Sequence, residues 1–349
     1  MKRLRPTLAI LLLVAIFVPG CIPKLADCKQ PGVFCVGLVT SVGRRDDHAY
    51  NQAAWDGIQQ AKAGGVVNWA ASIETNDARD YQENIKVFAD AGYDAIVTVG
   101  SAMADPTRLA AKAYPDIYFI AVDQDESANQ DFSPNLTGLV FAEDQIGYLA
   151  GALAAWMSKT GQIGAVLASD ALPPMKKYGE GFLAGSAYAN PSVNAVVSYH
   201  NDVGLDKTLV DPEWGATEAN SLVDSGADII FGAGGETGNN ALVAAVTRGT
   251  YAIGADTDQY YALPVAAPHL YVSVEKQIAQ GVAALVKTAR GAQSGSAAFP
   301  TGDYLGQVGL SPYHEADGLI PQDIKTRLAG LLQALLSGSL QTGVSFTSP

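Results

Sequence analysis

The chain has 349 residues and a net charge of −13, with 22 Lys and Arg against 35 Asp and Glu. With 48% hydrophobic residues it is too apolar for a disordered protein, and it is long enough for two lobes of ordinary domain size. The acidic balance argues against nucleic-acid binding, which uses clustered Lys and Arg.

The first twenty residues have the pattern of a secretory signal. Three basic residues within residues 1–6 precede an apolar run over residues 7–18. This run is too short for a stable membrane span, so we expect residues 1–20 to be a lipoprotein signal peptide. The end of the run, Val18-Pro19-Gly20-Cys21, resembles the lipobox of bacterial lipoproteins and predicts that Cys21 is acylated. The alternative is an ordinary signal peptide that ends near a Cys.

Two further cysteines, Cys28 and Cys35, lie in the following tether and at the start of the first expected strand. An even pair in an oxidising compartment favours a local disulfide, and their spacing allows one. Such a bond would fix the tether to the first strand. The alternative is two free thiols, with Cys35 as a small buried hydrophobic residue.

Beyond the tether, apolar segments of strand length alternate with segments of helical periodicity. The first series has strands over residues 34–40, 66–73, 95–99, 117–122 and 136–141, and helices over 51–63, 81–91, 106–113 and 146–158. The second series has strands over residues 163–168, 195–199, 228–231, 251–255, 270–274 and 304–310, and helices over 178–189, 216–224, 240–247, 276–289 and 322–336. Apolar strands separated by amphipathic helices predict parallel sheets covered on both sides. The chain is therefore expected to form two similar α/β lobes.

Polar residues and glycines follow several of these strands. Ligands of open α/β sheets gather at the carboxyl ends of the strands. The positions there are Ser41, Ser101, Asp123, Ser169, Gly234, Gly235 and Asp256. Residues 117–125 (IYFIAVDQD) and 251–258 (YAIGADTD) also end alike, in Asp-x-Asp. This pattern predicts a ligand cleft between the lobes, although loops commonly begin with residues of this type.

The sequence gives little support for catalysis or for a metal site. The four His residues are scattered without metal-ligand spacing, and the Gly-x-Ser-x-Gly and Walker A motifs are absent. Ser273–Lys276 and Lys159–Gly161 match Ser-x-x-Lys and Lys-Thr-Gly, but in the reverse of the order found in penicillin-binding enzymes. The two Asp-x-Asp segments lack the Gly and distal Glu of a calcium loop. We therefore expect no catalytic residue, metal or cofactor.

Seven segments carry a family resemblance, and the most specific is DDHAYNQAAWDG over residues 46–57. The others are VGLVT (36–40), GYLAG (147–151), YGEGFLAG (178–185), AGGETG (233–238), IGADTDQ (253–259) and SVEK (273–276). Together they resemble the basic membrane lipoprotein (BMP) family of ABC-transporter substrate-binding proteins, and among these the purine nucleoside receptor lipoproteins.

This resemblance implies an α/β, type I periplasmic-binding-protein fold, in which two Rossmann-like lobes with parallel sheets are joined by a three-crossover hinge. It also implies a lipid-anchored protein outside the cytoplasmic membrane, in the periplasm or on the cell surface, that delivers a nucleoside to an ABC permease. The expected domains are the signal peptide (1–20), the tether (21–33), lobe 1 (34–142 plus 270–295) and lobe 2 (143–269 plus 296–349).

The resemblance further implies roles for individual residues. Tyr50 and Tyr178, one on each lobe, would stack on the two faces of a planar base. Asp123 would contact the base edge, Asp256 would accept from two ribose hydroxyls, and Lys276 would donate to the sugar. The other expected ligand-binding residues are Ser41, Asn51, Gly234 and Gly235. Without the resemblance, the tyrosines are half-buried residues at helix starts, and Asp256 and Lys276 form a structural ion pair.

The chain departs from the nucleoside receptors at several of these positions. Ser41 stands where Asp is common, Gly43-Arg44-Arg45 precedes the Asp pair where Gly-Gly is common, and Tyr replaces Phe at both stacking positions. Other ligands therefore stay open, such as a flavin or another diol-bearing molecule. A surface interaction protein is a further alternative, although the sequence has no repetitive or apolar patch for it. An enzyme is disfavoured because no nucleophile–base pair is present.

Overall fold

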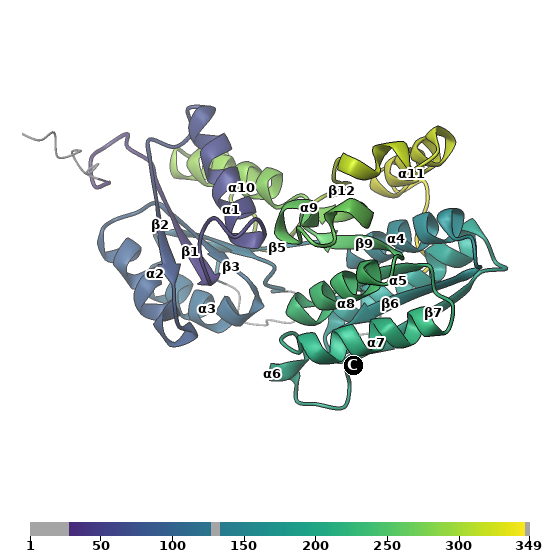
Figure 1. Ribbon diagram of the computed structural model, residues 1–349. Helices are drawn as coiled ribbons and strands as arrows, with labels where there is room; N and C mark the ends of the chain where they lie inside the picture. The colour runs from purple at the N-terminus through teal and green to yellow at the C-terminus, as the bar shows by residue number, and fades with distance from the viewer. Residues whose placement is uncertain (1–27, 127–132, 346–349) are drawn as a thin grey trace, which may run out of the picture.

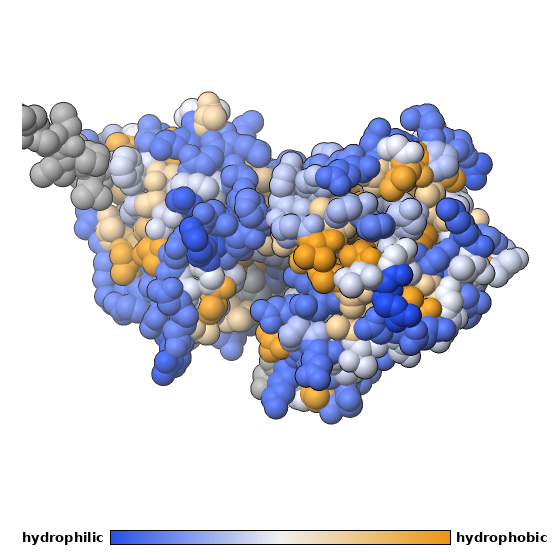
Figure 2. Space-filling view, in the orientation of Figure 1, coloured by the Kyte–Doolittle hydropathy of each residue, from blue (hydrophilic) through white to orange (hydrophobic). Residues whose placement is uncertain are grey.

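The computed structural model describes residues 28–126 and 133–345, which form two lobes side by side (Figure 1). Cys21 and the expected signal peptide lie outside these residues. The surface is indented where the two lobes meet at the lower edge of the view (Figure 2). Among the described residues, no helix is long and apolar enough to cross a bilayer.

Each lobe is built on one six-stranded sheet. The first sheet has the order β11-β5-β4-β3-β1-β2, and all of its strands are parallel. Its strands are β1 (Cys35–Val42), β2 (Trp69–Thr75), β3 (Ala95–Val99), β4 (Tyr118–Val122), β5 (Leu136–Val140) and β11 (Gly302–Leu305). Strands β1, β3, β4 and β5 are buried and largely apolar, which explains why the sequence pattern identified them. The edge strands differ: β2 is mostly half-buried and β11 is mostly exposed.

The second sheet has the order β12-β10-β9-β8-β6-β7 and is parallel except for β12, which pairs antiparallel with β10. Its strands are β6 (Gln162–Leu167), β7 (Asn194–Tyr199), β8 (Ile229–Ala233), β9 (Tyr251–Asp256), β10 (Leu270–Lys276) and β12 (Val308–Leu310). The two sheets share one connectivity, so β4 of the first corresponds to β9 of the second. The expected duplication of the α/β pattern is therefore confirmed.

Helices cover both faces of both sheets. On the first sheet, α1 (Tyr50–Ala63) and α10 (Ile278–Gln293) cover one face, and α2 (Tyr81–Asp90) and α3 (Ala104–Ala113) cover the other. On the second sheet, one face holds α4 (Glu143–Met157), α5 (Pro173–Ala189) and α11 (Gln322–Leu336), and the other holds α7 (Pro212–Asp224) and α8 (Gly235–Thr247). Short helices α6 (Leu205–Thr208) and α9 (Gln259–Ala262) lie in loops.

The chain passes between the lobes three times. The passages are residues 141–142 between β5 and α4, residue 277 between β10 and α10, and residues 306–307 between β11 and β12. Sheet pairing differs from the expected lobe boundaries, because β10 pairs with β9 in the second sheet and β11 pairs with β5 in the first. A local pattern indicates a strand but does not reveal its distant partner, so the expected boundaries place these two strands in the opposite lobes.

Two helices of the second lobe, α4 and α5, pack with their backbones in contact. Gly147 and Gly151 of α4 face α5, and Gly181 and Gly185 of α5 face α4; a Cβ at any of the four would overlap a backbone carbonyl oxygen of the other helix. For Gly147 that oxygen belongs to Tyr178. The glycines of these two family segments thus serve packing, and this packing holds Tyr178 in place.

The tether is joined to the first sheet by a disulfide between Cys28 and Cys35, whose Cα atoms are 5.7 Å apart. The bond links the tether to the first residue of β1. The structure therefore has the disulfide rather than the two free thiols.

Candidate ligand-binding site between the lobes

Two aspartates occupy equivalent positions at the carboxyl ends of the two sheets. Asp123 follows β4, and Asp256 ends β9, the corresponding strand of the other lobe. Both have a left-handed backbone, with φ of 59° and 72°. This conformation is uncommon for residues other than glycine, although Asp tolerates it better than most. The two aspartates thus share a backbone conformation as well as an equivalent position.

The ammonium of Lys276 lies between these aspartates. Its Nζ is 2.7 Å from Oδ1 of Asp123 and 3.6 Å from Oδ1 of Asp256. A third carboxylate, that of Glu143, has Oε1 at 3.4 Å. Because Lys276 ends β10 in the second sheet and Asp123 belongs to the first lobe, this ion pair connects the lobes. The helix expected from residue 276 begins instead at residue 278, which leaves Lys276 on the strand.

Three aromatic rings surround the same ammonium. Lys276 Nζ is 5.6 Å from the ring centroid of Tyr50, 5.7 Å from that of Phe141 and 5.8 Å from that of Tyr178, within the range of cation–π contacts. Tyr50 is the first residue of α1 and is half-buried. Tyr178, in the second turn of α5, is fully buried, and its hydroxyl donates a hydrogen bond to Asp256 Oδ1.

These contacts determine the protonation of the site. Burial opposes the charge of Lys276, but Asp123 and the other anionic neighbours outweigh burial, so the pKa of Lys276 is raised well above its usual value. Burial also raises the pKa of both tyrosines well above its ordinary value, with Asp256 adding to the effect at Tyr178 and Asp123 at Tyr50. At neutral pH the site therefore contains a charged ammonium and two neutral phenols. These groups can donate hydrogen bonds, and the carboxylates can accept them.

Ser41 and Asn51, which are expected to bind the ligand, make hydrogen bonds within the chain instead. Asn51 is buried, and its Oδ1 accepts from the backbone N–H of Ser41 at 2.9 Å and from Ser41 Oγ at 3.0 Å. Its Nδ2 donates to the carbonyl oxygen of Arg44 at 3.1 Å. Asp47 accepts from three backbone N–H groups at the start of α1. These bonds fix the loop that carries Tyr50, and in this structure the Asn51 amide is used within the chain.

Gly234 and Gly235 form the turn from β8 into α8, with positive φ of 101° and 66°. A Cβ on Gly234 would lie 2.7 Å from that of Ala168, and one on Gly235 would lie 2.5 Å from the carbonyl oxygen of Leu209. Glycine is therefore required here by backbone conformation and by close packing. The structure therefore explains the presence of glycine at both positions without a ligand.

Sequence reasoning missed Glu143 and Phe141, which complete the group around Lys276. Glu143 is the first residue of α4, and its side chain is only 5% exposed. Acidic residues are common in the first turn of helices because they favour the positive end of the helix dipole. Nothing in the local sequence therefore distinguished Glu143 from a surface residue.

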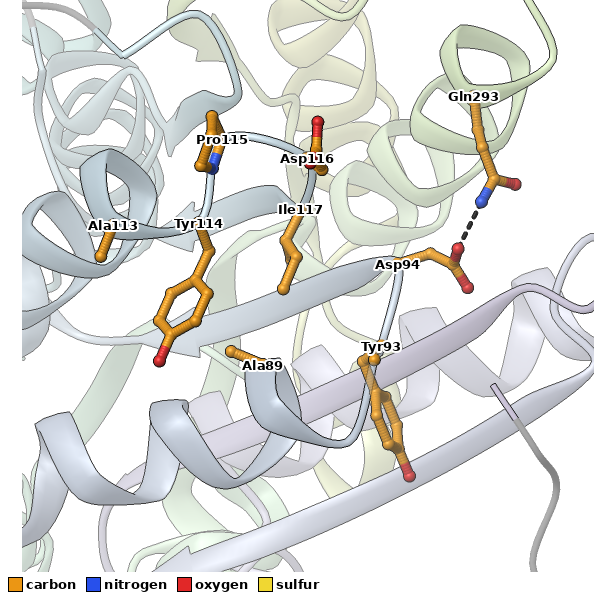
Figure 3. Close-up of a pocket in the computed structure, with 10 residues that line it drawn as sticks. Ala89, Tyr93, Asp94, Ala113, Tyr114, Pro115, Asp116, Ile117 and Gln293 are labelled. Atoms are coloured by element: carbon orange, nitrogen blue, oxygen red, sulfur yellow. Dashed lines mark hydrogen bonds between the residues drawn. The ribbon is translucent and has the colours of Figure 1, made fainter. Parts of the chain in front are cut away.

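A separate cavity of about 510 Å³ lies on the first lobe (Figure 3). Its lining includes Tyr93, Asp94, Tyr114 and Asp116 from the loops that precede β3 and β4. A hydrogen bond from Gln293 to Asp94 crosses its edge (Figure 3). The cavity is at the amino ends of these strands, whereas the group around Lys276 is at the carboxyl ends. It does not belong to the site between the lobes.

A family model described as ABC transporter substrate-binding protein PnrA-like matches residues 34–300. The chain belongs to this family. Members of the PnrA-like family are solute-binding components of ABC transporters and not enzymes, so this protein has a small-molecule ligand and a membrane permease as partner. The resemblance identified from the seven sequence segments is thereby confirmed.

Three relatives illustrate this similarity. The CD4+ T-cell-stimulating antigen of Listeria monocytogenes is 27% identical over 91% of this chain and 90% of its own length. Basic membrane protein A of Borreliella burgdorferi is 30% identical over 64% of this chain and 63% of its own. The ABC transporter nucleoside-binding protein BmpA of Lactococcus lactis is 28% identical over 64% of each. The match thus spans slightly less than two thirds of the last two relatives.

Solved structures support the fold. A solute-binding protein of an ABC transporter system from Conexibacter woesei superposes with a TM-score of 0.68 at 23% identity, covering 88% of this chain and 98% of that one. A solute-binding protein from Aeropyrum pernix gives 0.67 at 22% identity, covering 88% and 92%. Together with the strand order that the two sheets of this chain share, these neighbours confirm the type I periplasmic-binding-protein fold.

Proposed function

We propose that the protein is a lipid-anchored receptor of an ABC importer and binds a nucleoside, with a purine favoured, between its lobes. The observation that carries this proposal is the convergence of Asp123, Asp256 and Lys276 beside two tyrosines. The Lactococcus relative named as nucleoside-binding supports the ligand class.

Each group in this arrangement has a chemistry that suits part of a nucleoside. Asp123 accepts hydrogen bonds from N–H groups on the edge of the base. Asp256 accepts from two neighbouring hydroxyls, and Lys276 donates to the sugar. The ring of Tyr50 is available for stacking, with about 1–3 kcal/mol per stacked base.

Ligand entry requires the lobes to separate. Tyr178, Asp256 and Lys276 belong to the second lobe, whereas Tyr50 and Asp123 belong to the first. Opening of the hinge breaks the 2.7 Å contact between Lys276 and Asp123 and uncovers the buried ring of Tyr178. Closure then places the ligand between the two tyrosines, and the closed form is the one that the permease recognises.

A ligand panel tests this function. Thermal shift and calorimetry would compare adenosine, guanosine, inosine, cytidine and uridine with the free bases, ribose and riboflavin. A ligand at a hundredfold excess over its Kd stabilises the folded protein by about 2.7 kcal/mol, so nucleosides should raise the Tm clearly. Weaker binding of 2′-deoxyadenosine than adenosine would support the role of Asp256. If riboflavin alone raises the Tm, or if none of the nucleosides does, the proposal is contradicted.

The lipid anchor has a separate test in the full-length chain. Expressed in a bacterium, the wild type should fractionate with membranes and incorporate labelled palmitate. Cys21→Ser should remove the label and release the processed protein, while Cys28→Ser serves as the matched control that keeps it. Retention of the label in Cys21→Ser would contradict acylation at this residue.

A further inference from the structure

Glu143 connects two lysines through its two carboxylate oxygens. Its Oε1 is 3.4 Å from Nζ of Lys276, and its Oε2 is 3.3 Å from Nζ of Lys177 in α5. The Glu143 side chain is 5% exposed and that of Lys276 is 2% exposed. An unpaired charge in such surroundings is costly, so the burial of each side chain depends on its oppositely charged neighbours.

The positions of this pair in the chain are also informative. Glu143 is the first residue of α4, directly after the passage at residues 141–142, and Lys276 is the last residue of β10, directly before the passage at residue 277. The ion pair therefore joins two of the three segments that connect the lobes. Lys276 is thus in contact with residues that flank both of these segments.

The position of the Lys276 ammonium has to be fixed by the groups around it. An ammonium is a point charge on a flexible stem, and its position is determined by the acceptors around it. Asp123 is the nearest acceptor, but it belongs to the other lobe and separates from Lys276 when the hinge opens. Glu143 is fixed at the start of a helix that packs closely on α5. Of the two closer carboxylates, it is the one that stays with the second lobe.

We propose that Glu143 is a positioning residue that holds the Lys276 ammonium in place for the ligand and couples it to the hinge. This inference rests on the proposed function for the identity of the ligand. Glu143 acts through Lys276 and does not itself contact the ligand.

Calorimetric titration with adenosine tests the role in binding. Glu143→Gln keeps the shape but removes the charge, and we expect at least tenfold weaker binding, with part of the affinity restored in Glu143→Asp. The matched control is Glu180→Gln, which removes an exposed partner of Lys176 on α5 and should leave affinity unchanged.

The pH profile distinguishes this role from a merely structural one. The charged groups that face Glu143 are Lys276, Lys177 and Asp123, and burial raises the pKa of Glu143 above its ordinary value despite the two lysines. Wild-type affinity should therefore fall as the pH decreases toward the raised pKa of Glu143 and this carboxylate takes up a proton. Glu143→Gln should lack this part of the decline. Identical pH profiles and affinities in both proteins would overturn the inference.

A ligand-free measurement separates the two proposals. Thermal unfolding of Glu143→Gln, Lys276→Met and the double variant forms a cycle whose Tm changes should be non-additive, because the residues are in contact. If no nucleoside binds the wild type while the cycle is non-additive, the proposed function fails and the pairing of Glu143 with Lys276 stands. An additive cycle overturns the inference whatever the ligand is.

Discussion

The Nζ atom of Lys276 lies 2.7 Å from Oδ1 of Asp123, and the two residues belong to different lobes. This bond between the lobes involves a lysine that is almost completely buried. Removal of its carboxylate partner would therefore destabilise the folded protein. The same two groups are those that a ligand would contact. In the proposed function, ligand binding and the contact between the lobes therefore use the same two charges.

Asp256→Ala should abolish nucleoside binding and leave the protein folded. Two hydrogen bonds to a carboxylate contribute about 3 kcal/mol, so we expect a loss of affinity on the order of a hundredfold or more. Asp224→Ala, which removes an exposed partner of Arg248, is the control for loss of an acidic residue. Calorimetry gives the affinities, and circular dichroism monitors the fold. Unchanged affinity in Asp256→Ala would exclude the contact with the diol.

Tyr50→Ala should weaken nucleoside binding by about 1–3 kcal/mol, because the ring face is lost. Tyr50→Phe keeps the ring and should bind with nearly wild-type affinity. Calorimetry on the two variants at the same pH makes the comparison. Equal losses in both would assign the contribution to the hydroxyl rather than to the ring.

Gly147→Ala should destabilise the fold by about 2 kcal/mol or more, since its methyl group would overlap the carbonyl oxygen of Tyr178. Gly330→Ala in α11 is the control: nothing lies within 4 Å of a Cβ there. That variant should be stabilised by about 0.5–1 kcal/mol through helix propensity. Urea unfolding measures both, and similar stability of the two variants would contradict the packing argument.

Stability should decrease as the pH rises from about 4.5 to about 7 through the contribution of Glu275. Burial, with Asp258 adding to it, raises the pKa of this carboxyl from 4.5 to about 7, so the folded state binds a proton that the unfolded state has released. Glu275→Gln removes this contribution. Its free energy of unfolding, relative to wild type, should therefore increase over the same range. A constant difference between the two proteins would show that Glu275 does not titrate in this way.

Much of the site was accessible from sequence because its residues follow recognisable strands. Asp123 and Asp256 stand where apolar strands end, and Tyr50 lies in the most specific family segment. Asn51 lies in that segment too, yet its amide holds Ser41 and the loop. A motif groups residues of one functional segment. It does not distinguish those that stabilise the loop from those that face the candidate site.

The features that the sequence did not reveal depend on contacts between residues that are far apart in the chain. The exchange of β10 and β11 between the expected lobes follows from hydrogen bonding to β9 and β5, which no local pattern encodes. Glu143 was missed for the same reason: its partner Lys276 is far from it in the sequence.

The contact between α4 and α5 has a mechanical consequence. Because their backbones touch, neither helix can slide or tilt without the other, and they carry Glu143 and Tyr178 as a single rigid body. In the proposed function, these two side chains therefore keep their mutual spacing when the hinge opens, and the ligand first meets this preformed half of the site. The residues of the first lobe then close onto it.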